Sequence, residues 1–507
     1  KPITWLAAME EGWPKQGIRK DDLMSETQLR FSAFLAAVFA LYFAAAMLVP
    51  AAVDFFLGNP DWRVFVSSAV LVGAPAAACA LATRASPPRV NARFAFLLVN
   101  LLWVTSAIVG AIPFMLASIR LGLTDAVFEA VSALTTTGST VISGLDALPP
   151  GLLLWRSLLQ WMGGLGVVAL GLFVLPLLRI GGISFFRIES SDTADRPFAR
   201  FSTFTVALVG IYTVLTLLCA LSYATAGMTG FDAVNHAMTT LATGGFSTHD
   251  ASLGYYGKNS AVIWVGTVFM FVAGLPFSIL MLLVLRGRLE ALGDRQILVY
   301  VGFCVIFTLS VAVYLRVQSD FTPFEALTHS AFNFVSLITT TGFASTDYSL
   351  WGAFPVACAF LATILGGCSG STAGGIKAYR FLILFETMRS GLRQLVYPSS
   401  VATVRYGDRR VDTDMQDTAV LFICAFVVIW AITLILLAAT GLDFMTAATG
   451  ALTALTNVGP GLGDIVGPAG NFSELPDAAK WVLGGAMILG RLEILAVLVL
   501  LSPAFWS

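Results

Sequence analysis

The sequence has few charged side chains for its length. Only 12% of its 507 residues are Asp, Glu, Lys or Arg, whereas soluble proteins usually carry about 25%. Hydrophobic residues make up 57% of the chain and the mean hydropathy is +0.84. The net charge of −1 gives no indication of binding to nucleic acid. This composition excludes an ordinary soluble domain and predicts a polytopic protein in a lipid bilayer.

Residues that carry catalysis or bind metals are also scarce. The chain has only three histidines, which are far apart, and six cysteines with no Cys-x-x-Cys pair. No spacing fits a zinc site, and no nucleophile elbow, P-loop or dinucleotide-binding motif is present. We therefore expect no enzyme and no covalently bound cofactor. An intramembrane enzyme is the weaker alternative, because it would need a cluster of acids, bases or metal ligands at membrane depth.

What the chain does contain is one short motif that recurs four times. We call its copies strips one to four, and each has glycine as its fifth residue. The glycines recur at intervals of 107, 97 and 117 residues. This period is too long for a solenoid and suits a module of two spans with a re-entrant segment between them. The strips are Leu134–Thr140, Leu241–Ser247, Ile338–Ala344 and Leu455–Gly461.

Four such strips around one axis can hold a dehydrated cation. Carbonyl and hydroxyl oxygens replace the water around the ion, and glycine permits the backbone angles that this needs. No strip has an acidic side chain, and calcium sites prefer carboxylates, so we expect a monovalent cation. The alternative is four helix ends capped by small residues. Strip four has no hydroxyl group at the two positions before its glycine, but its backbone carbonyls could still serve. The predicted ion-binding residues are Thr136, Thr137, Gly138, Thr243, Gly244, Gly245, Thr340, Thr341, Gly342, Asn457, Val458 and Gly459.

The apolar runs predict an all-α protein with ten spans, and a short helix leads into each strip. The short helices are Asp125–Thr135, Asp232–Leu241, Pro323–Ile338 and Asp443–Leu455. The spans are about Phe31–Phe56, Val64–Ala82, Phe94–Ala117, Leu152–Leu178, Phe204–Ala226, Ala261–Leu285, Ile297–Leu315, an interrupted Phe354–Met388, Thr418–Ala439 and Trp481–Leu501.

These elements divide the chain into a leading part and four repeats of span, pore loop and span around a pseudo-fourfold pore. If the strips face outside, the inside segments carry 20 Lys and Arg and the outside segments carry 6. The positive-inside rule then places both termini in the cytosol. The predicted parts are a cytosolic N-terminal segment 1–30, two extra spans in 31–90, and repeats 91–200, 201–295, 296–415 and 416–507.

Each short helix begins near an acid: Asp125, Asp232, Glu325 or Asp443. An acid in the first turn suits the positive end of a helix dipole. The sequence Thr322-Pro323-Phe324-Glu325 also predicts a capping box. Helices that enter from outside would direct their partially negative ends at a cation in the membrane. Ordinary caps, or a ring of acids in the vestibule, are the alternatives.

A glycine-rich run interrupts the second span of repeat three and predicts a gate beneath the strips. Half of its ten residues are glycine, and glycine weakens a helix by about 1 kcal/mol relative to alanine. Non-helical backbone at this depth must be buried in protein or line water, and a packing surface of small residues is the alternative. The gate residues are Gly366, Gly367, Cys368, Ser369, Gly370, Ser371, Thr372, Ala373, Gly374 and Gly375, with Lys377 and Arg491.

Lys377 and Arg491 are charges inside apolar segments, and such charges usually face water or a protein-lined path. We expect Arg491 to donate to carbonyls of the glycine run or to raise the local potential. Pairing of Arg491 with Glu493 is disfavoured, because side chains two apart on a helix do not face each other. Two further pairs, Gly163-Gly164 and Gly484-Gly485, predict close helix contacts.

Three motifs beyond the strips carry a family resemblance: Gly374-Gly375-Ile376-Lys377, Gln160-Trp161-Met162-Gly163-Gly164 and Gly490-Arg491-Leu492-Glu493. With them the chain resembles the Trk/Ktr/HKT superfamily of potassium transporters, and its two leading spans make it most similar to the TrkH type. The resemblance implies potassium uptake across the bacterial inner membrane. It also implies a homodimer with one pore per subunit.

The resemblance implies regulation as well. A cytosolic ring of nucleotide-binding subunits of the TrkA type would gate the pore, so any nucleotide would act only through that partner. In this family the first-strip glycine favours potassium and a serine is associated with sodium, so Gly138 implies potassium. The alternative function is a symporter coupled to Na⁺ or H⁺. Broken helices fit that class, but four parallel repeats do not resemble an inverted pair.

Overall fold

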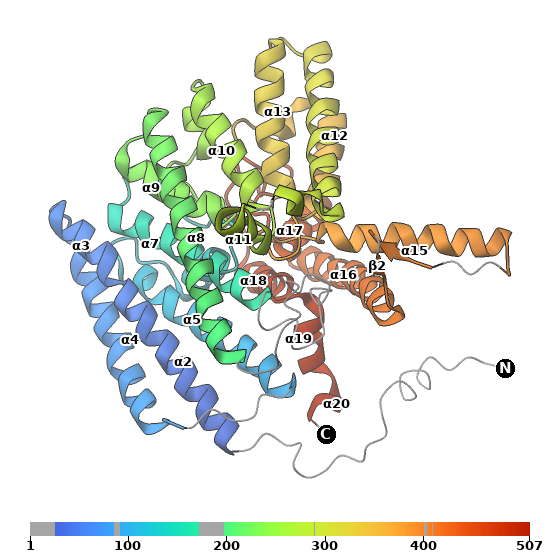
Figure 1. Cartoon of the computed structure of the whole chain (residues 1–507). Helices are drawn as coiled ribbons and strands as arrows, with labels where there is room; N and C mark the ends of the chain where they lie inside the picture. The colour runs from blue at the N-terminus through green and yellow to red at the C-terminus, as the bar shows by residue number, and fades with distance from the viewer. Residues whose placement is uncertain are drawn as a thin grey trace.

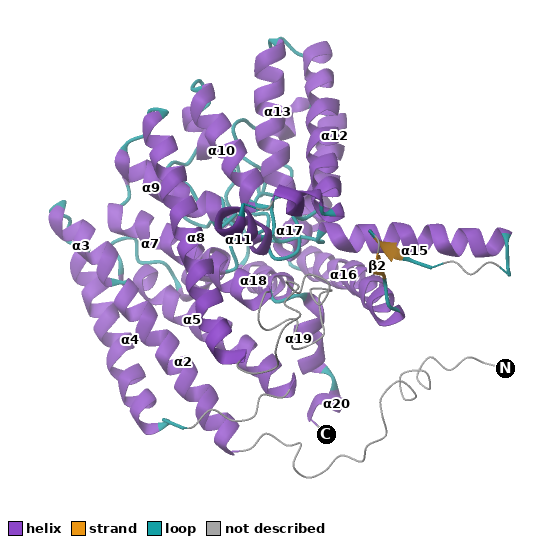
Figure 2. Ribbon diagram, in the orientation of Figure 1, coloured by secondary structure: helices purple, strands orange, loops and turns teal. Residues whose placement is uncertain are grey.

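The computed structural model describes residues 26–85, 92–171, 197–287, 289–399, 403–407 and 409–506. Most of them lie in helices that pack side by side in one bundle (Figure 1; Figure 2). The main helices are α2 (Glu26–Ala46), α3 (Leu48–Phe56), α4 (Trp62–Ala82), α5 (Ala92–Leu116), α6 (Leu123–Leu134), α7 (Pro150–Ala169), α8 (Pro197–Thr225), α9 (Gly230–Leu241), α10 (Ser260–Ala273), α11 (Phe277–Arg286), α12 (Arg295–Gln318), α13 (Pro323–Ile338), α14 (Ala353–Ile364), α15 (Ala378–Val396), α16 (Thr413–Ala439), α17 (Phe444–Thr456), α18 (Asp477–Arg491), α19 (Ile494–Leu501) and α20 (Pro503–Trp506).

The all-α class is confirmed, with one small exception. Strands β1 (Arg405–Tyr406) and β2 (Arg409–Arg410) form an antiparallel hairpin between α15 and α16. Most of the predicted N-terminal segment 1–30, and residues 172–178 of the second predicted span in repeat one, lie outside the described residues.

Seven helical segments of the described chain are long and apolar enough to cross a membrane, and they coincide with seven predicted spans. Each bent pair of helices adds one more candidate span. The interrupted segment of repeat three ends its first helix, α14, after only 12 residues. Within the described residues, the seven helices and two bent pairs account for nine of the ten predicted spans, and the tenth is the segment predicted to be interrupted. The second spans of repeats two to four are thus all broken.

Two of these breaks correct the sequence prediction. The run Ala261–Leu285 is divided into α10 and α11, which meet at 98°, and Trp481–Leu501 into α18 and α19, which meet at 111°. The first break lies at Gly274, whose carbonyl accepts a hydrogen bond from Cys368 N at 2.9 Å. The second lies at Glu493, which has a left-handed φ of +61°. Arg491 therefore ends α18 instead of lying in mid-helix.

The four short helices lie close to the predicted positions, and each packs on the span before it: α6 on α5, α9 on α8, α13 on α12 and α17 on α16. Thr322 and Glu325 form the predicted capping box at the start of α13. Asp443 caps α17 by accepting a hydrogen bond from Thr446 N at 3.1 Å. The same arrangement recurs at each repeat and directs each helix end toward the centre of the bundle.

Close contacts confirm one predicted glycine pair and not the other. A Cβ atom at Gly163 would lie 1.9 Å from the carbonyl oxygen of Leu134, and one at Gly164 would lie 2.8 Å from Ala242 Cα. Glycine thus lets α7 approach the ends of α6 and α9. Gly484 and Gly485 have no atom within 4 Å of such a position, so the contact predicted for them is wrong.

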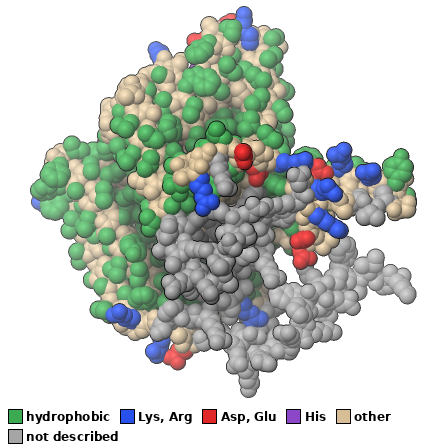
Figure 3. All heavy atoms as spheres, viewed as in Figure 1, with side chains coloured by type: hydrophobic (Ala, Val, Ile, Leu, Met, Phe, Trp, Pro, Cys, Tyr) green, Lys and Arg blue, Asp and Glu red, His purple; other side chains and the backbone are tan. Residues whose placement is uncertain are grey.

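The outer surface is apolar where lipid would cover it. On the face in Figure 3, hydrophobic side chains cover much of the bundle, and charged side chains lie mainly at its ends and along α15. The exposed apolar residues of α12 include Leu298, Val305, Ile306, Leu309, Val313 and Val317. Apolar exposure on this scale marks a membrane surface, and the chain is a multi-pass membrane protein.

A buried ion pair joins the first short helix to the next span. Arg156 Nε lies 2.8 Å from Glu129 Oε1, and the two side chains are 1% and 0% exposed. Glu129 also accepts from Thr140 Oγ1 and Val141 N, while Arg156 Nη1 donates to the carbonyl of Ser247 at 3.1 Å. One pair therefore fixes the segments that follow strips one and two.

We expect Arg156→Met to destabilise the protein by about 3–5 kcal/mol, since it leaves Glu129 as an unpaired buried charge. The measurement is the unfolding midpoint in detergent, with Arg316→Met on the exposed face of α12 as the matched control. Equal midpoints for the two variants would contradict the structural role assigned to the pair.

Candidate functional site

The four strips begin with the same helix-ending turn. The residue two places before each glycine is left-handed, with φ of 50° at Thr136, 51° at Thr243, 56° at Thr340 and 57° at Asn457. The next amide donates five residues back, as in Thr137 N to Ser132 O at 2.9 Å and Val458 N to Thr453 O at 3.1 Å. This is the Schellman pattern of a helix end. Strip four, although it has Asn457 where the other strips have threonine, has the same backbone conformation.

Three of these left-handed residues are threonines, and this is unusual. A β-branched residue with positive φ is a conformational outlier, and such strain of about 1–3 kcal/mol persists where the surroundings enforce it, often at functional sites. Asparagine tolerates the left-handed region better, which explains how Asn457 replaces threonine in strip four.

The strips close into a ring, in which each glycine lies against the next strip. A Cβ atom at Gly138 would lie 2.2 Å from the carbonyl oxygen of Gly244, and a Cβ atom at Gly245 would lie 2.0 Å from the carbonyl oxygen of Thr341. A Cβ atom at Gly342 would lie 1.9 Å from the carbonyl oxygen of Val458, and a Cβ atom at Gly459 would lie 2.5 Å from the carbonyl oxygen of Thr137. The four glycines also have φ between 73° and 103°. No other residue fits these positions without moving a neighbouring carbonyl.

Many carbonyl oxygens of the ring have no hydrogen-bond donor among the described residues. They belong to Thr136, Thr137, Gly138, Thr243, Gly245, Thr340, Thr341, Gly342, Asn457 and Val458. Buried carbonyls are nearly always paired, so a group of unpaired ones calls for an explanation. The structure therefore brings together all twelve residues predicted to bind an ion.

Side chains from neighbouring elements hold the strips in register. Gln160 of α7 donates to the Gly244 carbonyl at 2.6 Å and accepts from Phe246 N at 3.1 Å. Asn457 Nδ2 donates to Thr137 Oγ1 at 2.9 Å, and Ser139 Oγ donates to the Gly459 carbonyl at 3.0 Å. Helix α7 of repeat one is thus tied to strip two, and strip four is tied to strip one.

Sequence reasoning missed a second set of supporting residues. Nine places before the glycine of strips one to three lie Glu129, His236 and Asn333, all buried. Each side chain bonds the end of its own strip or the residue after it: Glu129 to Thr140, His236 to Ser247 and Asn333 to Ser345. A polar residue at one fixed distance before three of the four glycines was the signal that could have revealed them.

The predicted gate, which we call the glycine loop (residues 366–375), lies directly against strips three and four. Gly374 N donates to Thr340 Oγ1 at 2.6 Å, and Gly375 N donates to the Thr456 carbonyl at 2.8 Å. On its other side the loop meets the break between α10 and α11, where Phe277 N donates to the Gly370 carbonyl at 2.9 Å. The loop is therefore anchored on both sides of the space beneath the ring.

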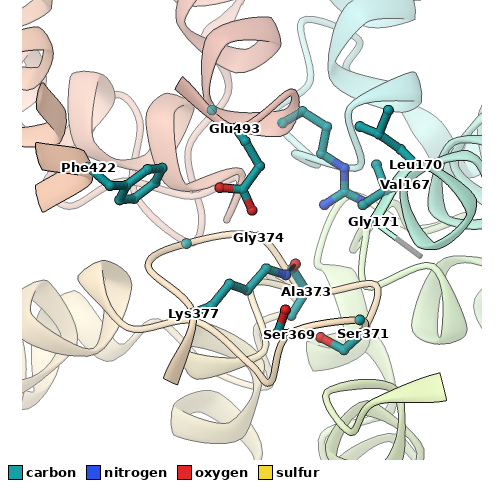
Figure 4. Close-up of a pocket in the computed structure, with 14 residues that line it drawn as sticks. Val167, Leu170, Gly171, Ser369, Ser371, Ala373, Gly374, Lys377, Phe422 and Glu493 are labelled. Atoms are coloured by element: carbon teal, nitrogen blue, oxygen red, sulfur yellow. Dashed lines mark hydrogen bonds between the residues drawn. The ribbon is translucent and has the colours of Figure 1, made fainter. Parts of the chain in front are cut away.

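Charged side chains surround a cavity next to the loop, and their arrangement corrects one expectation. Lys377 Nζ donates to the Ala373 carbonyl, and Figure 4 shows Lys377 pointing toward that residue. Glu493 accepts a hydrogen bond from Arg380, another residue that sequence reasoning missed. Arg491 also lines the cavity, but its three guanidinium nitrogens have no hydrogen-bond partner among the described residues. The predicted bonds from Arg491 to the loop are therefore absent.

The acids at the starts of the short helices are bound locally and do not form an open ring. Asp125 Oδ1 pairs with Lys480 Nζ at 2.7 Å. Asp232 accepts from the hydroxyl groups of Thr248 at 2.7 Å and Tyr256 at 2.9 Å. Glu325 belongs to the capping box and Asp443 is an N-cap. The capping alternative therefore describes Glu325 and Asp443, whereas Asp125 and Asp232 bind side chains of other segments.

His249 joins the outer loops that follow strips one and two. Its Nδ1 lies 2.5 Å from Asp146 Oδ1, its Nε2 lies 3.7 Å from Asp232 Oδ2, and its ring stacks on Tyr255. Partial burial lowers the pKa of His249, but hydrogen bonds to Asp232 and Asp146 outweigh burial and raise that pKa overall. Both carboxylates lie where they stabilise the protonated form of His249.

Comparison with known proteins supports one assignment. Residues 63–507 match the TrkH family, described as a cation transport protein. The chain is 43% identical to the Trk system potassium uptake protein TrkI of Halomonas elongata, over 93% of this chain and 95% of the relative. It is 34% identical to the Trk system potassium uptake protein TrkH of Escherichia coli K12, over 93% and 98%. The crystal structure of the potassium transporter TrkH from Vibrio parahaemolyticus is similar, with a TM-score of 0.87, 34% identity and coverage of 95% and 100%.

The His249 contacts predict a pH dependence of stability. Because its folded-state pKa is raised, the stabilisation is complete below the unfolded pKa of about 6.5 and is lost as the pH rises through the folded pKa. The unfolding midpoint should therefore decrease as the pH is raised from about 6 to about 9. His249→Gln should weaken this dependence of the midpoint on pH. Asp146→Asn removes the charge of the carboxylate that binds His249 and should also reduce the change of the midpoint with pH. A slope that persists in His249→Gln would assign it to other groups.

Proposed function

The chain belongs to the TrkH family of cation transport proteins, and on that premise we propose that it is a potassium uptake permease. Its named relatives are potassium uptake proteins. The strips carry no carboxylate, and neutral oxygens suit a weakly hydrated monovalent ion better than calcium. Potassium is here the transported ion and not a resident cofactor.

The closed ring of unpaired carbonyls is the observation that carries this proposal. The ion would pass between oxygens of Thr136–Gly138, Thr243–Gly245, Thr340–Gly342 and Asn457–Gly459. Four short helices end at the ring, and their partially negative C-terminal ends favour a cation there. Unpaired carbonyls are costly in a membrane unless another group binds them, and a dehydrated cation is such a group.

We infer that the glycine loop is the gate beneath this filter. Hydrogen bonds from Gly374 and Gly375 to strips three and four support that role. Arg491, buried and without a hydrogen-bond partner in the described chain, would raise the electrostatic potential for a cation in the cavity. Lys377 would act by holding the loop through Ala373.

The family assignment extends the proposal to the assembly. We propose a homodimer in the bacterial inner membrane with both termini in the cytosol, and a TrkA-type nucleotide-binding subunit as the regulatory partner. The excess of Lys and Arg on the inner segments supports the orientation. The chain itself would bind the bilayer and the partner, and no nucleic acid.

Flux into proteoliposomes that hold the purified chain tests the proposal. Potassium entry driven by voltage alone supports a channel-like permease, whereas a requirement for a sodium or proton gradient would establish the ion-coupled symporter. Entry of sodium as fast as potassium would contradict the filter assignment.

We expect Gly138→Ser to reduce the preference for potassium over sodium by about tenfold or more, which corresponds to about 1.4 kcal/mol in relative ion binding. The serine Cβ would displace the Gly244 carbonyl, which lies 2.2 Å from that position. Gly144→Ser is the matched control, because Gly144 also has positive φ but has no atom within 4 Å. Unchanged selectivity in Gly138→Ser would contradict the filter role.

We expect Arg491→Ala, and separately deletion of residues 369–373, to raise the basal potassium flux several-fold, because each removes part of the barrier beneath the filter. The flux per inserted protein is measured without any partner, and Arg316→Ala on the exposed face of α12 serves as the control. A lower flux in correctly inserted protein would indicate that the loop is a packing element.

A further inference from the structure

The hairpin of β1 and β2 lies beside the helix that continues from the glycine loop. Val404 and Val411, which flank the strands, are buried in a small core with Tyr379 and Ile383 of α15 and Ala419 of α16. The hairpin register pairs Arg405 with Arg410 and Tyr406 with Arg409. On the proposed orientation this hairpin lies on the cytosolic side, where a regulatory signal would arrive.

A chain of hydrogen bonds connects the hairpin to the loop. Tyr406 Oη donates to Asp294 Oδ1 at 2.5 Å. Asp294 is the N-cap of α12, and its Oδ1 also accepts a hydrogen bond from Gln296 N at 3.0 Å. Gln296 Oε1 then accepts from the backbone amide of Ser369 at 3.1 Å. Three side chains thus span from the hairpin to the middle of the glycine loop.

Gln296 is the member of this chain that contacts the loop, and its bonding is incomplete. The side chain is fully buried, and its Nε2 has no hydrogen-bond partner among the described residues. An unpaired buried donor is unfavourable, so the amide gains a bond in any arrangement that brings an acceptor to it. The loop lies directly beside it and has many carbonyls. Gln296 therefore favours the present loop position through one bond only.

We propose that Tyr406, Asp294 and Gln296 couple the position of the cytosolic hairpin to the glycine loop. The proposal rests on the proposed function of that loop as a gate. With the hairpin seated, Tyr406 holds Asp294, Asp294 orients the first turn of α12, and Gln296 keeps the Ser369 amide in place. Displacement of the hairpin releases Gln296 and loosens the loop. All three are positioning residues, and none lies in the ring of carbonyls.

Hydrogen exchange in lipid nanodiscs tests the coupling directly, because the backbone amide of Ser369 donates the hydrogen bond to Gln296 on which the coupling depends. Tyr406→Phe removes only the hydroxyl group and should speed exchange in peptides that cover residues 366–376 about five-fold, the effect of one lost hydrogen bond. Basal potassium flux should rise in parallel. Tyr397→Phe, at an exposed tyrosine beyond the end of α15, is the matched control and should change neither.

Two further variants separate a coupling role from a packing role. Asp294→Asn keeps an oxygen acceptor and an N-cap and should behave like the unchanged protein, whereas Asp294→Ala should reproduce the effect of Tyr406→Phe. Because the residues act in series, Tyr406→Phe combined with Gln296→Met should speed loop exchange no more than the stronger single variant.

The outcomes distinguish this inference from the proposed function. Unchanged loop exchange in Tyr406→Phe overturns the coupling, even if the protein conducts potassium. If hydrogen exchange rises equally in α12, α15 and α16, the coupling is also overturned, because the Tyr406–Asp294 hydrogen bond then only stabilises the surrounding helices. Faster loop exchange in a protein that conducts no potassium supports the coupling and overturns the permease.

Discussion

The structure depends on a ring of backbone carbonyls, most of which accept no hydrogen bond from any group in the described part of the chain. In a membrane such carbonyls are costly, because water is absent and each unpaired group loses a hydrogen bond. The surrounding residues act to keep them in that state. Schellman turns hold Thr136, Thr243, Thr340 and Asn457 in left-handed conformations, and glycine excludes side chains from the contacts between strips. Hydrogen bonds tie every strip to a neighbouring element, and most carbonyl oxygens of the ring have no donor in the described part of the chain.

The support of the ring differs from strip to strip, although the backbone conformation does not. Strips one and two are held mainly by Arg156 and Gln160 of α7. Strips three and four are instead contacted by the glycine loop, through Thr340 and the Thr456 carbonyl. Movement of the loop therefore removes bonds from one half of the ring and leaves the other half fixed. If the loop is the gate, as we propose, its movement would act on the filter as well as on the path beneath it.

Much of this arrangement follows from the sequence, because it is local. The four strips, the starts and ends of the short helices and the interruption before Lys377 are set by glycine, by caps and by the length of apolar runs. The breaks at Gly274 and Glu493 could not be predicted from those signals. Each sits in a continuous apolar run, and each depends on a partner about a hundred residues away, Cys368 for the first and Arg380 for the second. The unpaired state of Arg491 was missed for the same reason, since only the bend at the end of α18 determines what its side chain can reach.

These long-range breaks give the loop its dependence on the rest of the chain. The bends between α10 and α11 and between α18 and α19 place carbonyl groups and charged side chains around the loop. Straight helices would have directed these groups away from the loop. Glu493 forms an ion pair with Arg380, and the cavity is lined by the basic side chains of Lys377 and Arg491 together with Glu493. On the proposed function, a cation that entered the cavity would meet these charges before it reached the cytosolic side. The loop position and the electrostatic barrier therefore change together, since Lys377 is bonded to the loop and moves with it.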